Sequence, residues 1–512
     1  PTSPLIPRSL SFEMRFTSSF ILLTFLNVCL VNLSFVLAAA NADDVPLNVG
    51  IAEKDITPPV GYPLAGYFHE RLAEGQLDPL KAKAMVIRQG SQSFAVAFCD
   101  LTGIATDLTH AVRREITQRL DIKPEQIVLC ATHSHTAPDY YRDLFLHLSE
   151  KAAVPSTDYP AHLIEQISQC ILDADRNCRP VEVKIGSADQ QTPVSFNRRF
   201  VMRDGSVKTW QKLANPQVIR AAGPIDSVLS FCSFQSQSTG EPIGVLSNFA
   251  LHLDTVGGSR WSADFPYFIE QTLARNLGKS AHSLFGLGCC GDINHVDPSR
   301  SERNKTEFIG RELGQTLVDN LTSASSLETP RFDHQHDVVA LPLRPVTLPQ
   351  AARSRELMMA AKEGLDVEFF ELVRAYKTVV LAQFQNKNYE LLKNTAASWG
   401  LSHQLSGCGK ALPVEVHSIC LGPDLALVFL PGEVFVELGL AIKQASPFKQ
   451  TIVIELANSV ETAYLPTQAA FAGGSYEVTN STTQPGSGEK LVEQALKQLG
   501  KLASALQASS GP

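Results

Sequence analysis

Two histidines separated by one residue follow an apolar run, and this pattern has the most direct chemical meaning in the sequence. The run Ile127–Ala131 has the composition of a buried strand, and His133 and His135 come directly after it. In an extended chain these two side chains face the same way, about 6.5 Å apart, so one metal ion could bind either or both. A single histidine is more often structural, but a pair at the end of a strand indicates a metal-related site.

Two further side chains occupy the same kind of position. His252 follows the apolar run Ile243–Phe249, where it is either a metal ligand or a hydrogen-bonded core histidine. Glu433 follows the run Leu425–Phe429 and a Pro-Gly turn. A carboxylate there either binds a metal or stabilises the amino end of the next helix. The residues alone leave both alternatives open.

A glycine-rich turn with Asp292 lies between residues 287 and 295. Either a close approach of the backbone to a site or a plain tight turn would explain its glycines. It is not a phosphate-binding P-loop, because no Lys-Ser or Lys-Thr follows the second glycine. Near it, Ser262 or Asp264 is expected to cap a helix that begins at about Phe265.

The strands and helices that must position these residues are predicted by the hydrophobic pattern. The expected strands are Asn48–Ala52, Ala84–Ile87, Phe94–Cys99, Gln126–Ala131, Val181–Ile185, Val228–Phe234, Ile243–Phe249, Ser283–Leu287, Val338–Leu343, Val414–Cys420, Leu425–Phe429 and Thr451–Leu456. The expected helices are Leu108–Leu120, Ala161–Ala174, Phe265–Leu277, Glu307–Leu321, Leu348–Glu363, Val367–Leu392, Val434–Gln444 and Glu489–Leu506. Strands interleaved with helices predict an α/β fold, here one large domain of mixed β-sheets flanked by helices. Residues 348–400 are expected to form a helical insertion, and Gly473–Gly488 an irregular loop.

The composition excludes several classes of protein. With 44% hydrophobic and 19% charged residues the chain is an ordinary globular protein and is neither disordered nor a coiled coil. Its net charge of −8, without a basic stripe, argues against a nucleic-acid partner.

The N-terminal region has the pattern of a secretory signal peptide. Arg15 precedes an apolar stretch, Phe20–Ala40, that ends in small residues. We expect residues 1–42 to be an upstream segment with a signal peptide, and residues 43–512 to be the exported domain, whether periplasmic, secreted or at the cell surface. The alternative is an uncleaved membrane anchor. Export permits disulfides, and Cys170–Cys178 and Cys408–Cys420 are candidate pairs.

Taken in order, these motifs resemble the neutral (alkaline, non-lysosomal) ceramidase family over residues 47–480. The segments that carry the resemblance are Asn48–Pro59 with Gly66-Tyr67, Ala131–Pro138, Asn197-Arg198, Asn248–His252, Gly291-Asp292, Pro431–Glu433, and Asn458 with Tyr464 and Tyr476. The resemblance implies a neutral-ceramidase-like α/β domain with one zinc ion. Family members usually continue into a C-terminal immunoglobulin-like domain, whereas the sequence here predicts the helix Glu489–Leu506.

Carried over position by position, the resemblance implies four zinc ligands, which are His133, His252, Glu433 and Tyr464. It further implies that His135, Arg198 and Tyr476 are catalytic. The implied reaction is hydrolysis, by zinc-activated water, of the N-acyl amide of ceramide or a ceramide-like lipid, with peripheral membrane contact to reach the substrate. The alternatives are a zinc hydrolase of the same fold that acts on another amide or ester, and an inactive member that binds lipid or glycan.

Overall fold

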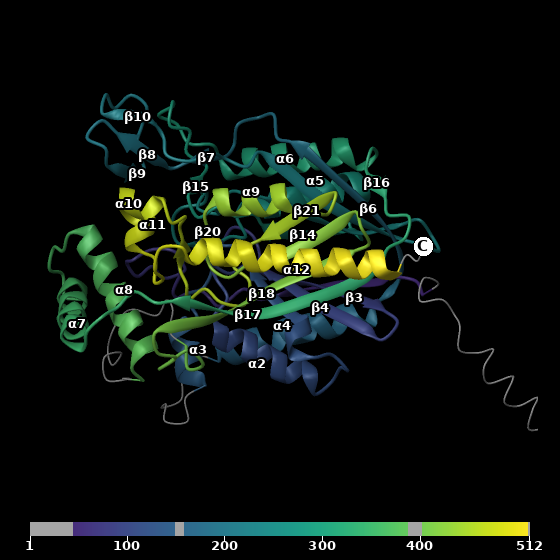
Figure 1. The fold of residues 1–512 in the computed structure, drawn as a ribbon, viewed down its shortest axis with the longest axis horizontal. Helices are drawn as coiled ribbons and strands as arrows, with labels where there is room; N and C mark the ends of the chain where they lie inside the picture. The colour runs from purple at the N-terminus through teal and green to yellow at the C-terminus, as the bar shows by residue number, and fades with distance from the viewer. Residues whose placement is uncertain (1–44, 149–157, 388–401, 510–512) are drawn as a thin grey trace, which may run out of the picture. The chain divides into compact units, whose positions relative to one another are not determined.

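A nine-stranded mixed sheet forms the larger half of the protein (Figure 1). The computed structural model describes residues 45–148, 158–387 and 402–509, and the residues from Pro46 onward form one compact unit. Along the sheet the strands are β14 (His282–Leu287), β12 (Pro242–Phe249), β11 (Val228–Ser236), β6 (Arg179–Asp189), β1 (Asn48–Asp55), β3 (Lys81–Gln89), β4 (Gln92–Cys99) and β5 (Ile127–Ala131), with β16 (Ser325–Ser326) beside β6. Neighbouring strands are antiparallel except for the outer pairs β12–β14 and β4–β5, which are parallel.

A four-stranded sheet packs against one face of the first. Its order is β17 (Phe332–Pro342), β18 (Ala411–Leu421), β19 (Leu425–Phe429) and β21 (Gln450–Ile454), with only β19 and β21 parallel. The alternation of side chains along the strands explains this packing. In β4, Phe94, Val96 and Phe98 face the second sheet, whereas Ala95 and Ala97 face the helices on the other side.

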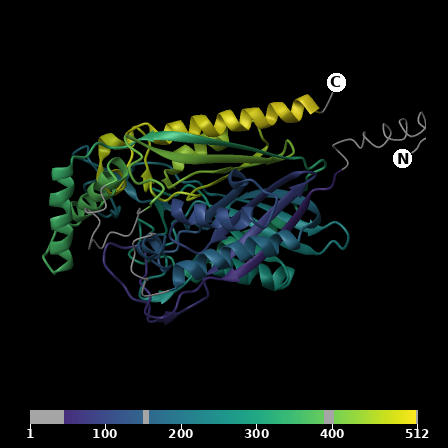
Figure 2. The same ribbon diagram turned by 90° about the horizontal axis from the view of Figure 1, so that it is seen from below.

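Helices cover the outer face of each sheet, so the layers run helix, sheet, sheet, helix (Figure 2). The nine-stranded sheet is covered by α2 (Thr106–Thr117), α4 (Tyr159–Arg176), α5 (Phe265–Leu277) and α6 (Thr306–Leu321). The four-stranded sheet is covered by α9 (Val436–Ala445) and α12 (Ser487–Ser509). The predicted α/β class, with mixed sheets flanked by helices, is confirmed.

Short elements sit at the end of the sheets where the candidate residues meet. These are α3 (Tyr141–His147), α10 (Ala470–Gly473), α11 (Ser475–Thr479) and the strands β2 (Gly75–Gln76), β7 (Phe196–Asn197), β8 (Arg199–Met202), β9 (Val207–Thr209), β10 (Val218–Ala221), β13 (Arg260–Trp261), β15 (Ile293–Asn294), β20 (Glu433–Val434) and β22 (Tyr464–Leu465). The short helix η2 (Pro124–Gln126) precedes β5 and lies at the opposite end of that strand. In the predicted helical insertion the structure has α7 (Leu348–Lys362) and α8 (Phe369–Gln385), packed on each other. The end of that prediction, from residue 388 to 400, lies outside the described residues.

Two expectations were wrong. The segment 473–488 is not irregular throughout, because α11 and the first residues of α12 lie in it. The two candidate disulfides are absent, since every cysteine of the described ranges is free. The Cys170 thiol instead donates to the carbonyls of Ala52 and Ala82 on the neighbouring strands, and the Cys420 thiol to Arg331.

The expected signal peptide lies outside the described residues. Within the described ranges, no helix combines the length and the apolar character that a membrane span requires.

Candidate active site

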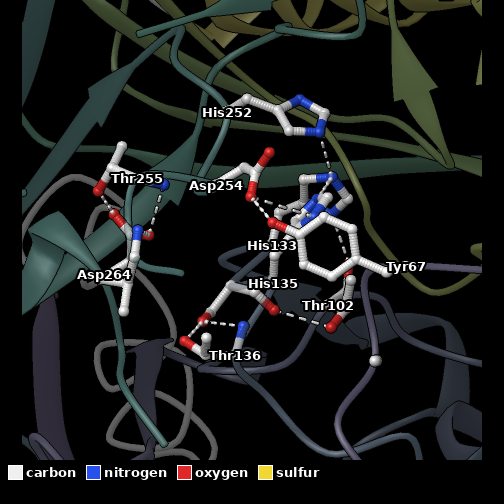
Figure 3. Close-up of polar contacts among 12 residues, drawn as sticks. Tyr67, Thr102, His133, His135, Thr136, His252, Asp254, Thr255 and Asp264 are labelled. Atoms are coloured by element: carbon white, nitrogen blue, oxygen red, sulfur yellow. Dashed lines mark hydrogen bonds and ion pairs between the residues drawn. The ribbon is translucent and has the colours of Figure 1, made fainter. Parts of the chain in front are cut away.

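The ends of three strands bring His133, His252 and Glu433 together in the interior. His133 follows β5, His252 follows β12, and Glu433 begins β20 just after β19, so both sheets contribute. Figure 3 shows the rings of His133, His135 and His252 turned toward one another. His133 Nε2 lies 3.0 Å from His252 Nε2 and 3.4 Å from Glu433 Oε2, and His252 Nε2 lies 3.8 Å from the same oxygen. All three side chains are buried.

The orientation of the two imidazoles favours a bound cation. His133 Nδ1 lies 2.5 Å from the carbonyl oxygen of Thr102, which can only accept, so Nδ1 carries a proton and Nε2 is turned toward His252 and Glu433. His252 Nδ1 lies 3.8 Å from the Cys290 sulfur, and burial, followed by the neighbouring His133, lowers the pKa of His252 well below the usual value. Imidazoles oriented by contacts of their outer nitrogens are the arrangement found at metal centres.

Glu433 completes this donor set. Its Oε2 is buried and has no hydrogen-bond partner in the described part of the chain, an expensive state for a carboxylate unless a cation lies beside it. Burial alone would raise the pKa of Glu433, but the neighbouring His133 and Tyr464 lower it, so the group stays ionised. Two histidine nitrogens and a carboxylate oxygen fit zinc. His133, His135 and His252 also form a group with its nitrogens close enough to share one ion.

The sequence predicted that the two histidines after β5 lie on an extended chain, but the backbone turns at His133. The strand ends at Ala131, and His133 has a φ of 77°, in the left-handed region that residues with a side chain rarely adopt. The turn brings the rings of His133 and His135 to a centroid distance of 4.9 Å. Gly66 leaves space for the His135 side chain, because a Cβ at residue 66 would lie 2.8 Å from that side chain.

Tyr464, Arg198 and Tyr476 line the same centre. Parallel pairing of β20 with β22 sets Tyr464 opposite Glu433, and the two side chains are hydrogen-bonded. Arg198, which is buried, donates from Nη2 to the Tyr464 hydroxyl at 3.0 Å and from Nε to Glu477 at 2.8 Å. The ring of Tyr476, on α11, lies 5.6 Å from that of Tyr464. All seven residues carried over from the resemblance therefore meet at one place.

The glycine-rich turn packs against the backbone segment that carries Glu433. A Cβ at Gly291 would lie 2.7 Å from the carbonyl oxygen of Glu433, so glycine is needed for the close approach of the two backbones. The carboxylate of Asp292 accepts from Val436 at the start of α9 and from Asn197. Cys290 donates to Glu455, which accepts from the backbone of Val434. As expected, Asp264 caps α5, and its carboxylate accepts from the backbone of Phe265.

A cavity of about 460 Å³ opens onto the metal-ligand candidates. His133, His135, Glu433, Tyr464 and Tyr476 line its base. Its walls combine apolar and aromatic side chains, such as Phe68, Leu146, Tyr376 and Val380, with charged ones, namely Glu70, Asp139, Arg142, Asp143, Lys362 and Lys377. A cavity of this size and composition suits a small amphiphilic molecule.

Several residues of the site had not been predicted. Thr102 orients His133 through its backbone, and Glu477 holds Arg198 through a fully buried carboxylate. Lys377 lines the cavity from α8. A signal for Lys377 is present in the sequence, because it interrupts the apolar stripe Val373, Val380, Leu381 and Phe384 at helical spacing.

A second group of metal-binding types, His336, Glu415 and His417, lies on β17 and β18. Both guanidinium nitrogens of Arg113 donate to the Glu415 carboxylate at 2.8 Å, and Asn458 donates to it as well. Since these donors already occupy the carboxylate, the group is better described as an ion-pair network that links the two sheets.

Comparison with known proteins agrees with this architecture. Residues 47–259 match the family described as neutral/alkaline non-lysosomal ceramidase, N-terminal. Two solved structures are similar: neutral ceramidase from Pseudomonas aeruginosa (TM-score 0.63, 18% identity, covering 90% of this chain and 75% of that one), and a ceramidase complexed with C2 (TM-score 0.64, 18% identity, covering 90% and 76%). A search of curated proteins gives no match.

The fold and the site together define a mixed α/β protein with a candidate metal centre at the base of a cavity. The predicted resemblance to the neutral/alkaline ceramidase family is confirmed by the family match and by the similarity of fold.

Proposed function

We propose that this protein is a zinc-dependent amidohydrolase that cleaves the N-acyl amide bond of ceramide or a ceramide-like lipid, with water as the nucleophile. The observation that carries the proposal is the convergence of His133, His252, Glu433 and Tyr464 beside a cavity that has aromatic and aliphatic side chains among its lining residues. The ceramidase family match over residues 47–259 supports the substrate class.

His133, His252, Glu433 and Tyr464 would hold the zinc, which when bound lowers the pKa of a water molecule and polarises a carbonyl group. His135 is placed to accept a proton from the attacking water and to pass it to the leaving amine. Its Nδ1 lies 3.8 Å from Asp254, which is itself hydrogen-bonded to Tyr67, and its Nε2 lies 3.3 Å from His133 Nε2. Burial, followed by the neighbouring His133, lowers the pKa of His135, so the ring is neutral and can accept a proton at Nε2. It then returns this proton to the leaving amine.

Tyr476 and Arg198 act on the carbonyl group. The Tyr476 hydroxyl donates a hydrogen bond to the oxygen on which charge develops as water attacks, an interaction worth about 3 kcal/mol of barrier. Arg198 keeps its charge, because its neighbours Tyr464 and Glu477 outweigh the effect of burial and raise its pKa. Its fixed position orients Tyr464 and anchors an oxygen of the substrate.

We also propose that the protein is exported and meets its substrate at a lipid surface. The apolar stretch Phe20–Ala40 supports export. Exposed Trp210 and Phe369 pack beside Tyr476, and such amphipathic aromatic side chains suit a lipid–water boundary.

The experiment that tests the proposal combines metal analysis with turnover. We expect purified protein to contain one zinc per chain and to release fatty acid from at least one of a panel of N-acyl lipids. H252A should lose both, and H282A, which changes a histidine on β14 outside the site, should lose neither. Circular dichroism checks that both variants are folded. Release of fatty acid from none of the lipids, or full zinc content in H252A, would overturn the proposal.

A further inference from the structure

Lys377 is a buried lysine without a partner in the described part of the chain. Only 6% of its surface is exposed, and it forms no hydrogen bond or ion pair with any residue that the structure describes. It lies on the apolar stripe of α8, with Val373 one turn before it and Val380 and Phe384 after it, all buried. An ammonium group in such a place costs free energy, and a leucine or methionine would pack better.

Lys377 is one of the residues that line the active-site cavity, together with Glu433, Tyr464, Tyr476 and Asn480, and its amine is close enough to feel the charge of Glu433. Asn480 shows the same deficit, since its Oδ1 is buried without a partner while its amide nitrogen donates to the Tyr476 hydroxyl. Two polar groups left unpaired beside one cavity indicate that a polar part of a ligand binds next to the candidate metal centre.

We propose that Lys377 binds a carboxylate carried by the substrate, so that the preferred substrates are N-acyl amides with a negatively charged amine portion, such as N-acyl amino acids. This inference rests on the proposed amidohydrolase function and narrows its substrate class. Lys377 is a specificity-determining residue here and takes no part in breaking the bond.

The charges around the cavity agree with this assignment. Burial lowers the pKa of Lys377 to about 8, and the charge of Glu433 acts in the opposite direction. The ammonium form therefore still predominates near neutral pH. Glu433 does not form an ion pair with the lysine within 4 Å, and it faces His133 and His252 instead. A substrate carboxylate would give this amine a counter-charge at ion-pair distance, which no residue in the described ranges supplies.

The test compares two substrates with the same acyl chain, N-dodecanoylglycine and N-dodecanoylethanolamine. We expect wild type to have the higher kcat/KM for the glycine conjugate. In K377M the ratio of the two kcat/KM values should fall at least tenfold, mainly through KM, and K377R should restore most of it. The control R374M removes a positive charge from an exposed position one turn earlier on α8 and should change the ratio less than twofold.

Four results would overturn the inference. The first is an equal loss of kcat/KM on both substrates in K377M, and the second is the same change of the ratio in R374M. The third is a lower melting temperature of K377M than of wild type, which would indicate a structural role. The fourth is weaker inhibition of K377M by dodecanoate without a change of the ratio, which would show that the lysine recognises the product. If wild type hydrolyses neither substrate, the panel of N-acyl lipids decides whether the proposed function fails, and the inference is tested separately by calorimetry. It stands if N-dodecanoylglycine binds at least tenfold more weakly to K377M than to wild type, and it fails if the two bind equally.

Discussion

Tyr476 is the residue whose surroundings are best suited to a role in catalysis without metal binding. Its ring is packed between Trp210, at a centroid distance of 4.8 Å, and the stacked ring of Phe369 at 6.0 Å, so its hydroxyl has little freedom. Burial raises its pKa well above the usual value, and the hydroxyl therefore remains a donor at any pH at which the protein is folded. Such a donor needs no rearrangement during the reaction.

Replacing Tyr476 by Phe should lower kcat by about 100- to 1000-fold on any N-acyl lipid that the protein cleaves, because the rings still pack but the donor is lost. Zinc content should stay at one per chain. The measurement is steady-state kinetics with metal analysis on the same sample, and Y267F, on α5 away from the site, is the matched control. A loss of zinc together with activity would show that Tyr476 acts on the metal instead.

The candidate role of a residue could be predicted from the sequence where the residue directly follows a predicted strand. His133, His252 and Glu433 could be singled out because each follows an apolar run, and the structure brings these three together. Tyr464, Arg198 and Tyr476 came only from the family resemblance, since nothing local marks them. Lys377 and Glu477 were missed, because the meaning of a single charged residue appears only when its neighbours in space are known.

At the scale of elements, the network around Glu415 joins β18 to α2 and to the turn at Asn458. Arg113 comes from α2, and Asn458 also accepts a hydrogen bond from the backbone of Leu129 in β5, the strand that leads to His133. Burial alone would raise the pKa of Glu415, but the neighbouring His336, His417 and Arg113 lower it far below the usual range. The Glu415 carboxylate therefore has a structural role, because it connects β18 to α2 and to the turn at Asn458.

Replacing Glu415 by Gln should lower the free energy of unfolding by about 3 kcal/mol at pH 7.5, because Arg113 loses its counter-charge. The folded-state pKa is depressed, so this stabilisation is complete above the unfolded-state value of 4.5 and declines as the pH falls below it. At pH 3.5 the difference between wild type and E415Q should be smaller by about 1 kcal/mol. Urea denaturation at the two pH values measures this, with E493Q on the exposed side of α12 as the control. A difference that grows at low pH would contradict the assignment.

Most of the elements were predictable because their apolar periods are regular. The predicted helix Phe265–Leu277 has the same bounds in the structure. The short α11 escaped prediction, since its sequence, Ser475–Thr479, has the composition of a loop and the helix is held by contacts with β9 and α8. The order of the strands could not be predicted from local sequence patterns, because β1 pairs with both β3 and β6, which are far apart in the chain.

At the scale of the whole molecule, the candidate metal ligands lie on both sheets. His133 and His252 follow strands of the nine-stranded sheet, whereas Glu433 and Tyr464 follow strands of the four-stranded one. A ligand that binds only the folded state stabilises it by mass action, so an ion held by all four residues would strengthen the packing of one sheet on the other.

Zinc at 100 times its dissociation constant should therefore add about 2.7 kcal/mol to the free energy of unfolding of the metal-free protein. We expect a higher melting temperature in differential scanning calorimetry when zinc is added after chelation, and no shift in H252A. Magnesium, which prefers oxygen ligands in octahedral geometry, should have little effect on wild type. An equal shift in wild type and H252A would place the bound zinc elsewhere.

The division of the ligands between the sheets also has a consequence for synthesis on the ribosome. Residues 47–259, which match the ceramidase family, include both histidines, but Tyr464 is translated 212 residues after His252. At 5–20 residues per second this interval lasts roughly 10 to 40 s. During it the nascent chain holds two imidazoles without the oxygen ligands that complete the set. If these four residues bind a metal ion, its tight capture would therefore be a late event, which follows the emergence of the second sheet from the exit tunnel.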